Sequence, residues 1–410
     1  MKKTTVKGTN DYLPSEARLR GYLEATILKT YTDAGFERIM TPAVEDIENL
    51  DKSDGGDNLN LIFKILKRGD KLDKALAAGD VSGLCDMGLR YDLTLPLSRY
   101  YANNREQLLM PAKCIQIDRV YRAERPQKGR LREFVQCDID IIGSSSPSCE
   151  IELIHTTAKA LLALGMEGFT VKINDRRILR SLLKSCGFAQ SQLDSVCITF
   201  DKLDKIGAEG VKAELREKGF GADAIDKFSV LIENPLTLEN VKEFCEDNLT
   251  ENIEFIISSA NELSGGRYNI DFDISLVRGQ GYYTGTVFEI VSDKFRGSIA
   301  GGGRYDNLIG KFTGEDIPAV GFSIGFERIF AILSETERPI PDAKKKIALL
   351  FETADAAKAI KAAEKLRAEY DVALSEKPKK LSKYLDRLKD NGYYGFCFLD
   401  NIEDIRELKA

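Results

Sequence analysis

The segment from Leu131 to Ile141 alternates between polar and apolar side chains, and this pattern constrains the fold more than any other stretch. Residues two apart in a β-strand point to the same face of the sheet. One face therefore carries Arg132, Phe134, Gln136, Asp138 and Asp140, and the other carries Leu131, Val135, Cys137, Ile139 and Ile141, with Glu133 as the exception. Pro126 and Gly129 mark a turn just before this segment. We predict an antiparallel hairpin that is apolar behind and polar in front.

The polar face of this hairpin places cations, an aromatic ring and acids in order. The cations around the turn are Arg122, Arg125, Lys128, Arg130 and Arg132. Arginine offers forked N–H donors that match phosphate oxygens, and an aromatic ring such as Phe134 stacks on a base. Asp140 could bind a ligand cation or an N–H donor. The order therefore favours a cleft for an anion beside a flat ring and a cation. The alternative is a hairpin with a solvated basic tip.

Composition and missing motifs exclude several classes of protein. The net charge of -6 over 410 residues means that any RNA contact must use a local patch. The only histidine, His155, lies in a helical pattern, which argues against a catalytic triad or a multi-histidine metal site. The sequence has no Walker loop, no GxGxxG fingerprint and no CxxC pair. Without a signal peptide or a membrane-spanning apolar run, we expect a cytoplasmic protein with reduced thiols.

Strand and helix signals alternate along most of the chain. Residues 15–36 predict an amphipathic helix ended by Gly35, residues 36–47 a strand that contains Pro42, and residues 56–80 a mixed, helical segment. A charged helical region follows the helix around His155 and runs to about Ser264. Residues 297–333 predict a glycine-rich turn, a strand and a helix, and residues 346–400 alternate strand and helix, which is typical of a small α/β unit.

Several separated stretches resemble conserved motifs of the class II aminoacyl-tRNA synthetases. The hairpin is similar to motif 2, FERIMTPAVED to motif 1, and PAVGFSIGFERI, which includes Arg328, to motif 3. KGTNDYLP, LRYDLTLP and LVRGQGYYTGTVFE resemble the histidyl-tRNA synthetase family in particular. The resemblance implies an α+β fold: a class II synthetase antiparallel sheet flanked by helices, with a helical insertion and a small C-terminal α/β domain.

The resemblance also implies domain boundaries. Residues 1–172 and 265–333 would form the two parts of a catalytic domain, and residues 173–264 the helical insertion. Residues 334–345 would be a linker, and residues 346–410 a shortened anticodon-binding-like domain. Dimerisation through the motif 1 region is expected. A basic cluster in the last domain would contact tRNA phosphates; it comprises Lys377, Lys379, Lys380, Lys383, Arg387 and Lys389.

Roles for site residues follow from the resemblance, position by position. The ATP-binding residues would be Arg122 at the α-phosphate, Glu124 at the adenine amino group, Arg130 at the γ-phosphate, Phe134 stacked on adenine, and Arg328. The histidine-binding residues would be Asp92, Thr94 and Gln136 at the α-ammonium, and Asp140, Tyr283 and Tyr305 in the side-chain pocket. Arg122, Arg278 and Gln136 would serve catalysis. ATP with Mg²⁺, histidine and histidine tRNA would be the substrates, with no protein-only metal site.

Alternatives remain for single residues and for the whole chain. Asp92 could be a helix N-cap, Tyr283 a core aromatic, and GGGR only a turn. Gln280 and Gly281 replace the Leu-Asp pair that is usual in the family signature. A non-catalytic synthetase-like regulatory subunit of ATP phosphoribosyltransferase would share the fold. A paralogue that activates histidine without charging tRNA is another alternative.

Overall fold

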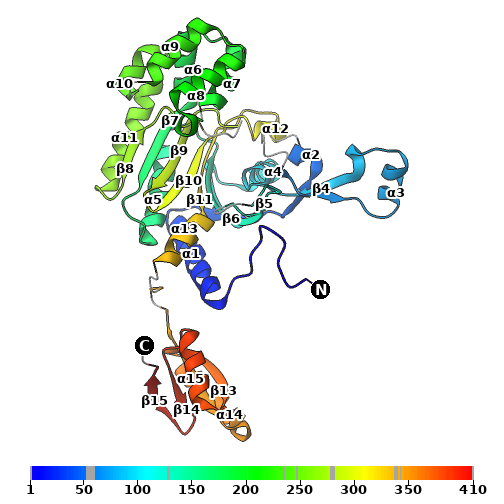
Figure 1. The fold of residues 1–410 in the computed structure, drawn as a ribbon, viewed down its shortest axis with the longest axis vertical. Helices are drawn as coiled ribbons and strands as arrows, with labels where there is room; N and C mark the ends of the chain where they lie inside the picture. The colour runs from blue at the N-terminus through cyan, green and yellow to red at the C-terminus, as the bar shows by residue number, and fades with distance from the viewer. Residues whose placement is uncertain are drawn as a thin grey trace. The chain divides into compact units, whose positions relative to one another are not determined.

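The computed structural model describes residues 2–51, 61–126, 130–200, 202–233, 236–245, 248–277, 282–336, 340–341 and 343–408. The chain forms two compact units, Met1–Glu337 and Arg338–Ala410 (Figure 1). Each unit has its own hydrophobic clusters.

The first unit is built on an eight-stranded sheet with the order β1-β5-β6-β11-β10-β9-β7-β8. Its strands are β1 (Glu37–Arg38), β5 (Ala112–Tyr121), β6 (Glu133–Ile142), β7 (Thr170–Asp175), β8 (Asn269–Phe272), β9 (Thr286–Ser292), β10 (Phe295–Arg304) and β11 (Ala319–Gly325). The outermost pairs β1·β5 and β7·β8 are parallel, and all the others are antiparallel. The predicted antiparallel sheet flanked by helices is confirmed, and so is the hairpin of β5 with β6.

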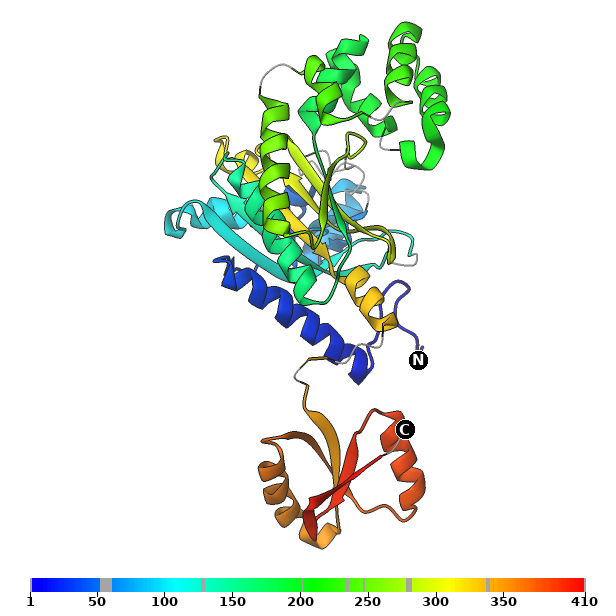
Figure 2. The same cartoon turned by 90° about the vertical axis from the view of Figure 1, so that its left-hand side faces the viewer.

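Helices pack on one face of this sheet. They include α1 (Pro14–Asp33), α5 (Ser148–Ala163), α11 (Leu249–Ser264) and α13 (Phe326–Glu335). Figure 2 shows α5 and α11 side by side in front of the sheet, with α1 below them in blue. The apolar side chains of β6 meet Leu23 and Ile27 of α1 in the main core. His155 lies on α5, away from the pocket described below, as expected for a structural helix residue.

Residues 36–47 form two short strands in different sheets, so the prediction of one strand is wrong. After β1, the chain enters β2 (Val44–Asp46), which pairs with β4 (Cys85–Leu89) in a three-stranded sheet. Pro42 has no N–H to give to a ladder and lies at the break. The buried side chain of Arg90 donates from Nη1 to the carbonyl of Thr41 at 2.7 Å and so satisfies this interrupted backbone.

The segment that follows is less helical than predicted. β3 (Lys64–Leu66) completes the three-stranded sheet, and only α3 (Asp70–Ala77) is helical between Leu61 and Asp80. Residues 52–60 lie outside the described part of the chain. α2 (Ile47–Asp51) and α4 (Thr94–Asn104) accompany this small sheet.

The glycine-rich segment is a strand, so the prediction of a turn there is wrong. Gly301, Gly302 and Gly303 belong to β10, between β9 and β11. A Cβ at Gly302 would lie 2.0 Å from the carbonyl oxygen of Gly321, and one at Gly303 would lie 2.7 Å from that of Thr286. Glycine is required because the neighbouring strands approach too closely for a side chain.

The helical region consists of α6 (Arg176–Cys186), α7 (Leu193–Phe200), α8 (Leu203–Glu217), α9 (Ala222–Ile232), α10 (Leu238–Val241) and then α11. Phe188, Phe200 and Phe228 pack edge to face in its centre. β7 continues to Asp175, past the expected domain boundary at 173, and Asp175 caps α6 by accepting from the backbone N–H of Arg177. Figure 1 shows α6 to α10 gathered beyond one end of the sheet.

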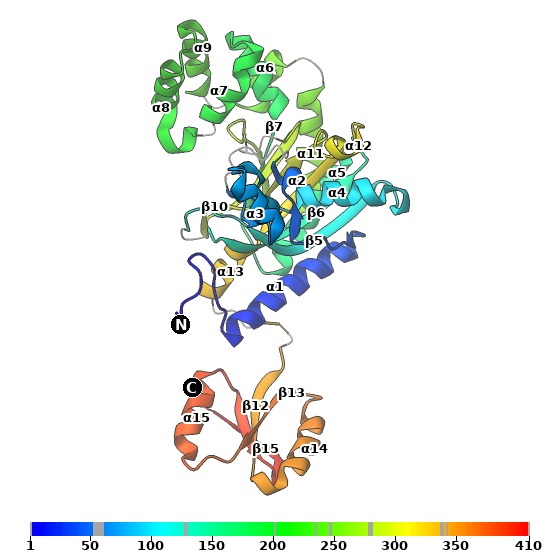
Figure 3. The ribbon, with the colours of Figure 1, turned by 90° about the vertical axis from the view of Figure 1, so that its right-hand side faces the viewer.

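The second unit has a four-stranded sheet with the order β13-β12-β14-β15. Its strands are β12 (Lys345–Phe351), β13 (Tyr370–Glu376), β14 (Gly395–Phe398) and β15 (Asn401–Glu407), and its helices are α14 (Ala356–Leu366) and α15 (Leu381–Asp390). β12 is parallel to β13 and β14, and β15, which the sequence did not predict, is antiparallel. Ile347 and Leu349 face α14, whereas Ala348 and Leu350 face α15. Figure 3 shows the two helices on opposite faces of this sheet.

Candidate active site

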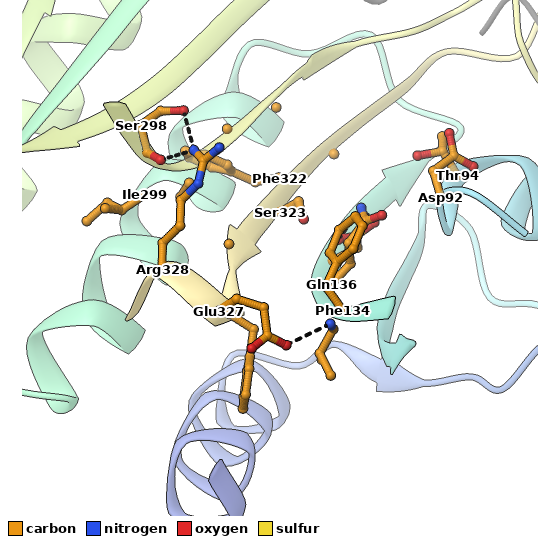
Figure 4. Close-up of a pocket in the computed structure, with 18 of the residues that line it drawn as sticks. Asp92, Thr94, Phe134, Gln136, Ser298, Ile299, Phe322, Ser323, Glu327 and Arg328 are labelled. Carbon is orange, nitrogen blue, oxygen red and sulfur yellow. Dashed lines mark hydrogen bonds between the residues drawn. The ribbon is translucent and has the colours of Figure 1, made fainter. Parts of the chain in front are cut away.

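A cavity of about 450 Å³ lies on the face of the large sheet where the polar side chains of β6 point. β6, β10 and β11 form its floor, the loop before α4 and the segment after β5 form its sides, and the start of α13 closes one end. Figure 4 shows Arg328 and Ser298 across the cavity from Phe134 and Gln136, with Asp92 and Thr94 farther along. The pocket thus collects residues from segments that are far apart in the sequence.

The predicted site residues that the structure describes all line this one pocket. They are Asp92, Thr94, Arg122, Glu124, Arg130, Phe134, Gln136, Asp140, Tyr283, Tyr305 and Arg328. Arg278, Gln280 and Gly281 lie outside the described residues, as do Lys128 and Gly129 of the predicted turn. Leu131 also lines the pocket, although the alternation placed it on the apolar side. Its position differs because β6 begins only at Glu133, so the two-residue period does not extend to Leu131.

One end of the pocket is acidic. Asp92, Asp138 and Asp140 are each less than 6% exposed. Burial is the main cause that raises the pKa of Asp92 to about 6 and that of Asp138 to about 7. Burial, followed by the charge of Asp138, raises the pKa of Asp140 well above its usual range. Carboxylates this close and this dry favour binding a cation, which would stabilise their ionised forms.

Asp140 is held from the neighbouring strands. The hydroxyl of Tyr305 donates to its Oδ1 at 2.5 Å. Gly321 of β11 pairs with Asp140 of β6, and a Cβ at Gly321 would lie 1.9 Å from the same oxygen. Tyr282 and Tyr283 pack beside this end, with ring centroids 4.8 Å apart. The acid therefore sits in an aromatic enclosure whose floor is glycine.

Asp92 has a structural contact as well as a place in the pocket. Its Oδ1 accepts from the backbone N–H of Leu95 in the first turn of α4 at 3.2 Å. The N-cap residue of α4 is Leu93, so the interpretation of Asp92 as the N-cap is wrong by one position, although its carboxylate reaches the helix N-terminus from the pocket wall.

The other end of the pocket is cationic and aromatic. The guanidinium of Arg122 lies 5.1 Å from the ring centroid of Phe134, and its Nε donates to the carbonyl of Tyr91 at 3.0 Å. Arg130 pairs with Glu124 at 3.4 Å. Arg328 donates from Nη1 to the carbonyl of Ser298 and to its hydroxyl. Such an end suits a phosphorylated ligand with a flat ring.

Two acidic residues of the pocket were not predicted as site residues. Asp138 lies between Gln136 and Asp140 on the face of β6 that the alternation had defined, so the signal was present in the sequence. Glu327 accepts both arms of Arg20 from α1, at 2.6 and 2.8 Å, and also the backbone N–H of Val135 at 3.2 Å. The contact with Arg20 joins residues 307 apart and the contact with Val135 joins residues 192 apart, which no local pattern reveals.

Comparison with known proteins gives this geometry a family. The sequence model described as "Histidyl-tRNA synthetase" matches residues 8–329. A histidine–tRNA ligase from Leifsonia xyli subsp. xyli is 41% identical over 97% of this chain and 95% of its own length. The chain belongs to the histidyl-tRNA synthetase family. A second histidine–tRNA ligase, from Christiangramia forsetii, is 38% identical over 94% of this chain and 90% of its own length.

Solved structures agree with the assignment to the histidyl-tRNA synthetase family. The histidyl-tRNA synthetase from Nostoc sp. PCC 7120 is 28% identical, with a TM-score of 0.78 over 97% of this chain and 91% of that one. An ATP phosphoribosyltransferase regulatory subunit/histidyl-tRNA synthetase from Bacillus halodurans C has the same TM-score, covers 97% of this chain and 98% of its own, and at 21% identity shares the fold alone. The chain is thus an enzyme, an aminoacyl-tRNA synthetase.

Two further observations concern the histidyl-tRNA synthetase chain as a whole. Within the described ranges, no group of His, Cys, Asp and Glu side chains is arranged to hold a metal ion. None of the helices in the described part of the chain has the length and apolar character needed to span a bilayer.

Proposed function

We propose that the pocket binds histidine at its acidic end and ATP at its cationic end, and that the two react where the ends meet. The observation that carries this proposal is the position of Arg122. Its guanidinium lies against Phe134 at the cationic end. Burial raises the pKa of both Asp92 and Asp138 at the acidic end, and the charge of Arg122 is near enough to offset part of this rise. A bound carboxylate and a bound α-phosphate would both lie within reach of this one cation.

The acidic end suits free histidine because the amino acid carries an ammonium and an imidazole with N–H donors. Asp92, Thr94 and Gln136 would hold the ammonium, whereas Asp140, Tyr283 and Tyr305 would surround the imidazole. A buried carboxylate with a phenol as second partner recognises such a ring by hydrogen bonds. A site of this kind strongly rejects analogues that leave its polar groups unpaired.

The cationic end suits ATP, which would arrive with Mg²⁺ as one substrate complex. Phe134 would stack on the adenine, Glu124 would accept from its amino group, and Arg130 and Arg328 would bind the phosphate chain. The carboxylate of histidine then attacks the α-phosphorus in line and pyrophosphate leaves. The substrate is already a nucleophile, so the protein need only position the reactants and stabilise charge, with Arg122 and Arg278 as the cations that do so.

Transfer to tRNA completes the reaction. The 3'-terminal ribose hydroxyl of histidine tRNA would attack the carbonyl of the adenylate and release AMP. We propose that the second unit is the anticodon-binding-like domain and that the basic cluster around α15 contacts tRNA phosphates. Four apolar residues of α15, Leu381, Tyr384, Leu385 and Leu388, pack on the sheet, which is consistent with the basic side chains facing outward.

The assembly and location are also proposals. The protein would act in the cytoplasm as a homodimer that pairs through the motif 1 region. Two features support this interface: β1 is an edge strand of the large sheet, and the side chain of Met40 beside it is 76% exposed. An edge strand has unpaired backbone N–H and C=O groups, which can pair with another chain.

Pyrophosphate exchange tests the proposed activity most directly. Purified protein with Mg²⁺ and ATP should incorporate labelled pyrophosphate into ATP only when histidine is added. A regulatory subunit would give no exchange, and a paralogue that only activates histidine would give exchange without charging histidine tRNA. Absence of exchange with every amino acid would contradict the proposal.

A further inference from the structure

The side-chain amide of Gln136 has an acceptor without a partner. Its Oε1 is buried in the pocket and has no hydrogen-bond partner among the described residues. A buried acceptor left unpaired costs free energy, and such groups in native proteins commonly mark the place of a ligand. Oε1 can therefore accept a hydrogen bond from a donor group of the ligand that the pocket binds.

The other half of the same amide is occupied. Nε2 of Gln136 faces both carboxylate oxygens of Asp138, at 3.4 and 3.3 Å. Asp138 comes two residues later on the same face of β6, is 5% exposed, and lines the same pocket. An ionised carboxylate accepts hydrogen bonds but donates none. A cation bound in the pocket would favour this ionised form of Asp138. The ionised carboxylate then selects the orientation of the amide in which the nitrogen points toward Asp138.

We infer that Asp138 is a positioning residue for substrate recognition: it fixes the Gln136 amide so that Oε1 faces the α-ammonium of histidine. The inference rests on the proposed function, because it needs the ammonium at that place. If the amide were reversed, the two N–H donors of Nε2 would face the α-ammonium, and the amide would repel this cation instead of attracting it. The carboxylate beside it prevents this reversal and adds negative charge behind the amide.

The test compares two non-reactive probes. Histidinol keeps the imidazole and the ammonium of histidine but lacks the carboxylate. The second probe is deaminated histidinol, which keeps the imidazole and lacks both the carboxylate and the ammonium. Each is measured as an inhibitor of pyrophosphate exchange at several histidine concentrations. The ratio of their inhibition constants reports recognition of the ammonium alone, because both probes carry the same imidazole.

In the wild type, histidinol should bind more tightly than its deaminated counterpart. Asp138→Asn presents an N–H donor that lets the Gln136 amide reverse, so this preference should fall by about 10-fold to 100-fold, the range for a hydrogen bond to a charged group. The KM for ATP should stay within about twofold. Asp138→Ala, which removes the group without adding a donor, should lower the preference less than Asp138→Asn does.

A double mutant separates positioning from direct contact. In a Gln136→Ala background, Asp138→Asn should change the preference little further, because the residue through which it acts is gone. Glu133→Gln is the matched control, since it neutralises a carboxylate on the same strand but outside the pocket. It should leave the preference unchanged.

Two results would overturn the inference while leaving the activity itself intact. One is an unchanged preference in a folded Asp138→Asn protein that still exchanges pyrophosphate. The other is full additivity of the Gln136 and Asp138 effects, which would mean that Asp138 contacts the ammonium directly. Loss of histidine-dependent exchange in the wild type would instead reject the proposed function.

Discussion

The hydroxyl of Tyr305 donates a 2.5 Å hydrogen bond to Oδ1 of Asp140, and both groups are buried at the acidic end of the pocket. The two residues come from different parts of the sheet. Asp140 lies in β6 and Tyr305 directly follows β10, with β11 between these strands. The phenol occupies one oxygen of the carboxylate and thereby orients the group toward the pocket.

Loss of the Asp140 carboxylate should weaken histidine binding selectively. Asp140→Ala should raise the KM for histidine by about 100-fold or more, because it removes a charged partner from a buried site, and change the KM for ATP little. Tyr305→Phe keeps the carboxylate and should raise the KM for histidine by about 10-fold. Steady-state pyrophosphate exchange measures both constants. Equal weakening of the two substrates by Asp140→Ala would show that the residue is structural.

Arg122 should matter most for the chemical step. Arg122→Ala should slow adenylate formation by about 100-fold or more, on the scale of losing one donor to developing charge. Rapid-quench measurement of a single turnover isolates this step from substrate binding. Arg119→Ala is a suitable control because this neighbouring arginine pairs with Glu133 and does not line the pocket. A comparable slowing by both variants would contradict the assignment.

The buried carboxylates should make stability depend on pH. Asp138 is faced by Asp92, Asp140, Arg122, Gln136 and Ser323. Burial raises its pKa from 3.8 to about 7, so the folded state holds a proton that the unfolded state has released, and stability falls as pH rises between about 4 and 7. Asp138→Asn removes this penalty.

The melting temperature of Asp138→Asn relative to the wild type should therefore increase from pH 5 to pH 7 and then level off. Thermal unfolding of both proteins without ligands, from pH 5 to pH 8.5, provides the comparison. Asp92 and Asp140 contribute in the same direction, because burial raises the pKa of each. A difference that is independent of pH would mean that Asp138 is ionised throughout this range.

Arg20, which does not line the pocket, should support the ATP end through its ion pair with Glu327, which does. Glu327 precedes Arg328 and binds the backbone N–H of Val135, the residue after Phe134. The guanidinium of Arg20 also lies 4.1 Å from the ring centroid of Tyr12. Arg20→Met should raise the KM for ATP several-fold and leave that for histidine unchanged, whereas Arg20→Lys should retain part of the affinity. A change confined to histidine would be the opposite of this expectation.

Removal of the second unit should separate the two half-reactions. A chain that ends at Pro341 keeps the described lining of the pocket, so histidine-dependent pyrophosphate exchange should be nearly intact. Charging of tRNA should fall sharply, and residual tRNA binding should depend less on salt because phosphate contacts are lost. Charging assays from low to high salt provide the comparison. Equal charging by both chains would mean that the second unit does not bind RNA.

The sequence predicted β6 well because its two faces meet different environments. Cys137, Ile139 and Ile141 enter the core, while Gln136 and Asp140 enter the pocket, so a two-residue period is visible in the residue types. The two-residue period did not predict the side-chain directions of the residues before Glu133, where β6 begins. Arg132, predicted on the pocket face, instead donates from Nε to the carbonyl of Glu124 at 3.1 Å.

Features set by tertiary contact were not visible in the sequence. Glycine runs are typical of turns, and the close approach that requires Gly302 depends on strands that are distant in sequence. Pro42 was recognised, but not that it separates strands of two different sheets. The ion pair of Arg20 with Glu327 joins two helices at opposite ends of the first unit's sequence. In each case the residue could be singled out in the sequence, but the residue or strand that it contacts could be identified only from the folded structure.

The glycine floor of β10 has a consequence for how this enzyme could acquire a new substrate. At Gly302 and Gly303 this floor consists of main chain rather than of any side chain, because glycine has no Cβ. Mutation therefore has nothing to trim at Gly302 or Gly303, and any residue added there collides with main chain. Room for a larger amino acid must be opened from the tyrosine walls, at Tyr282, Tyr283 or Tyr305. The range of amino acids that the pocket accepts can therefore change through substitutions in its tyrosine walls, but not through substitutions at the glycines of its floor.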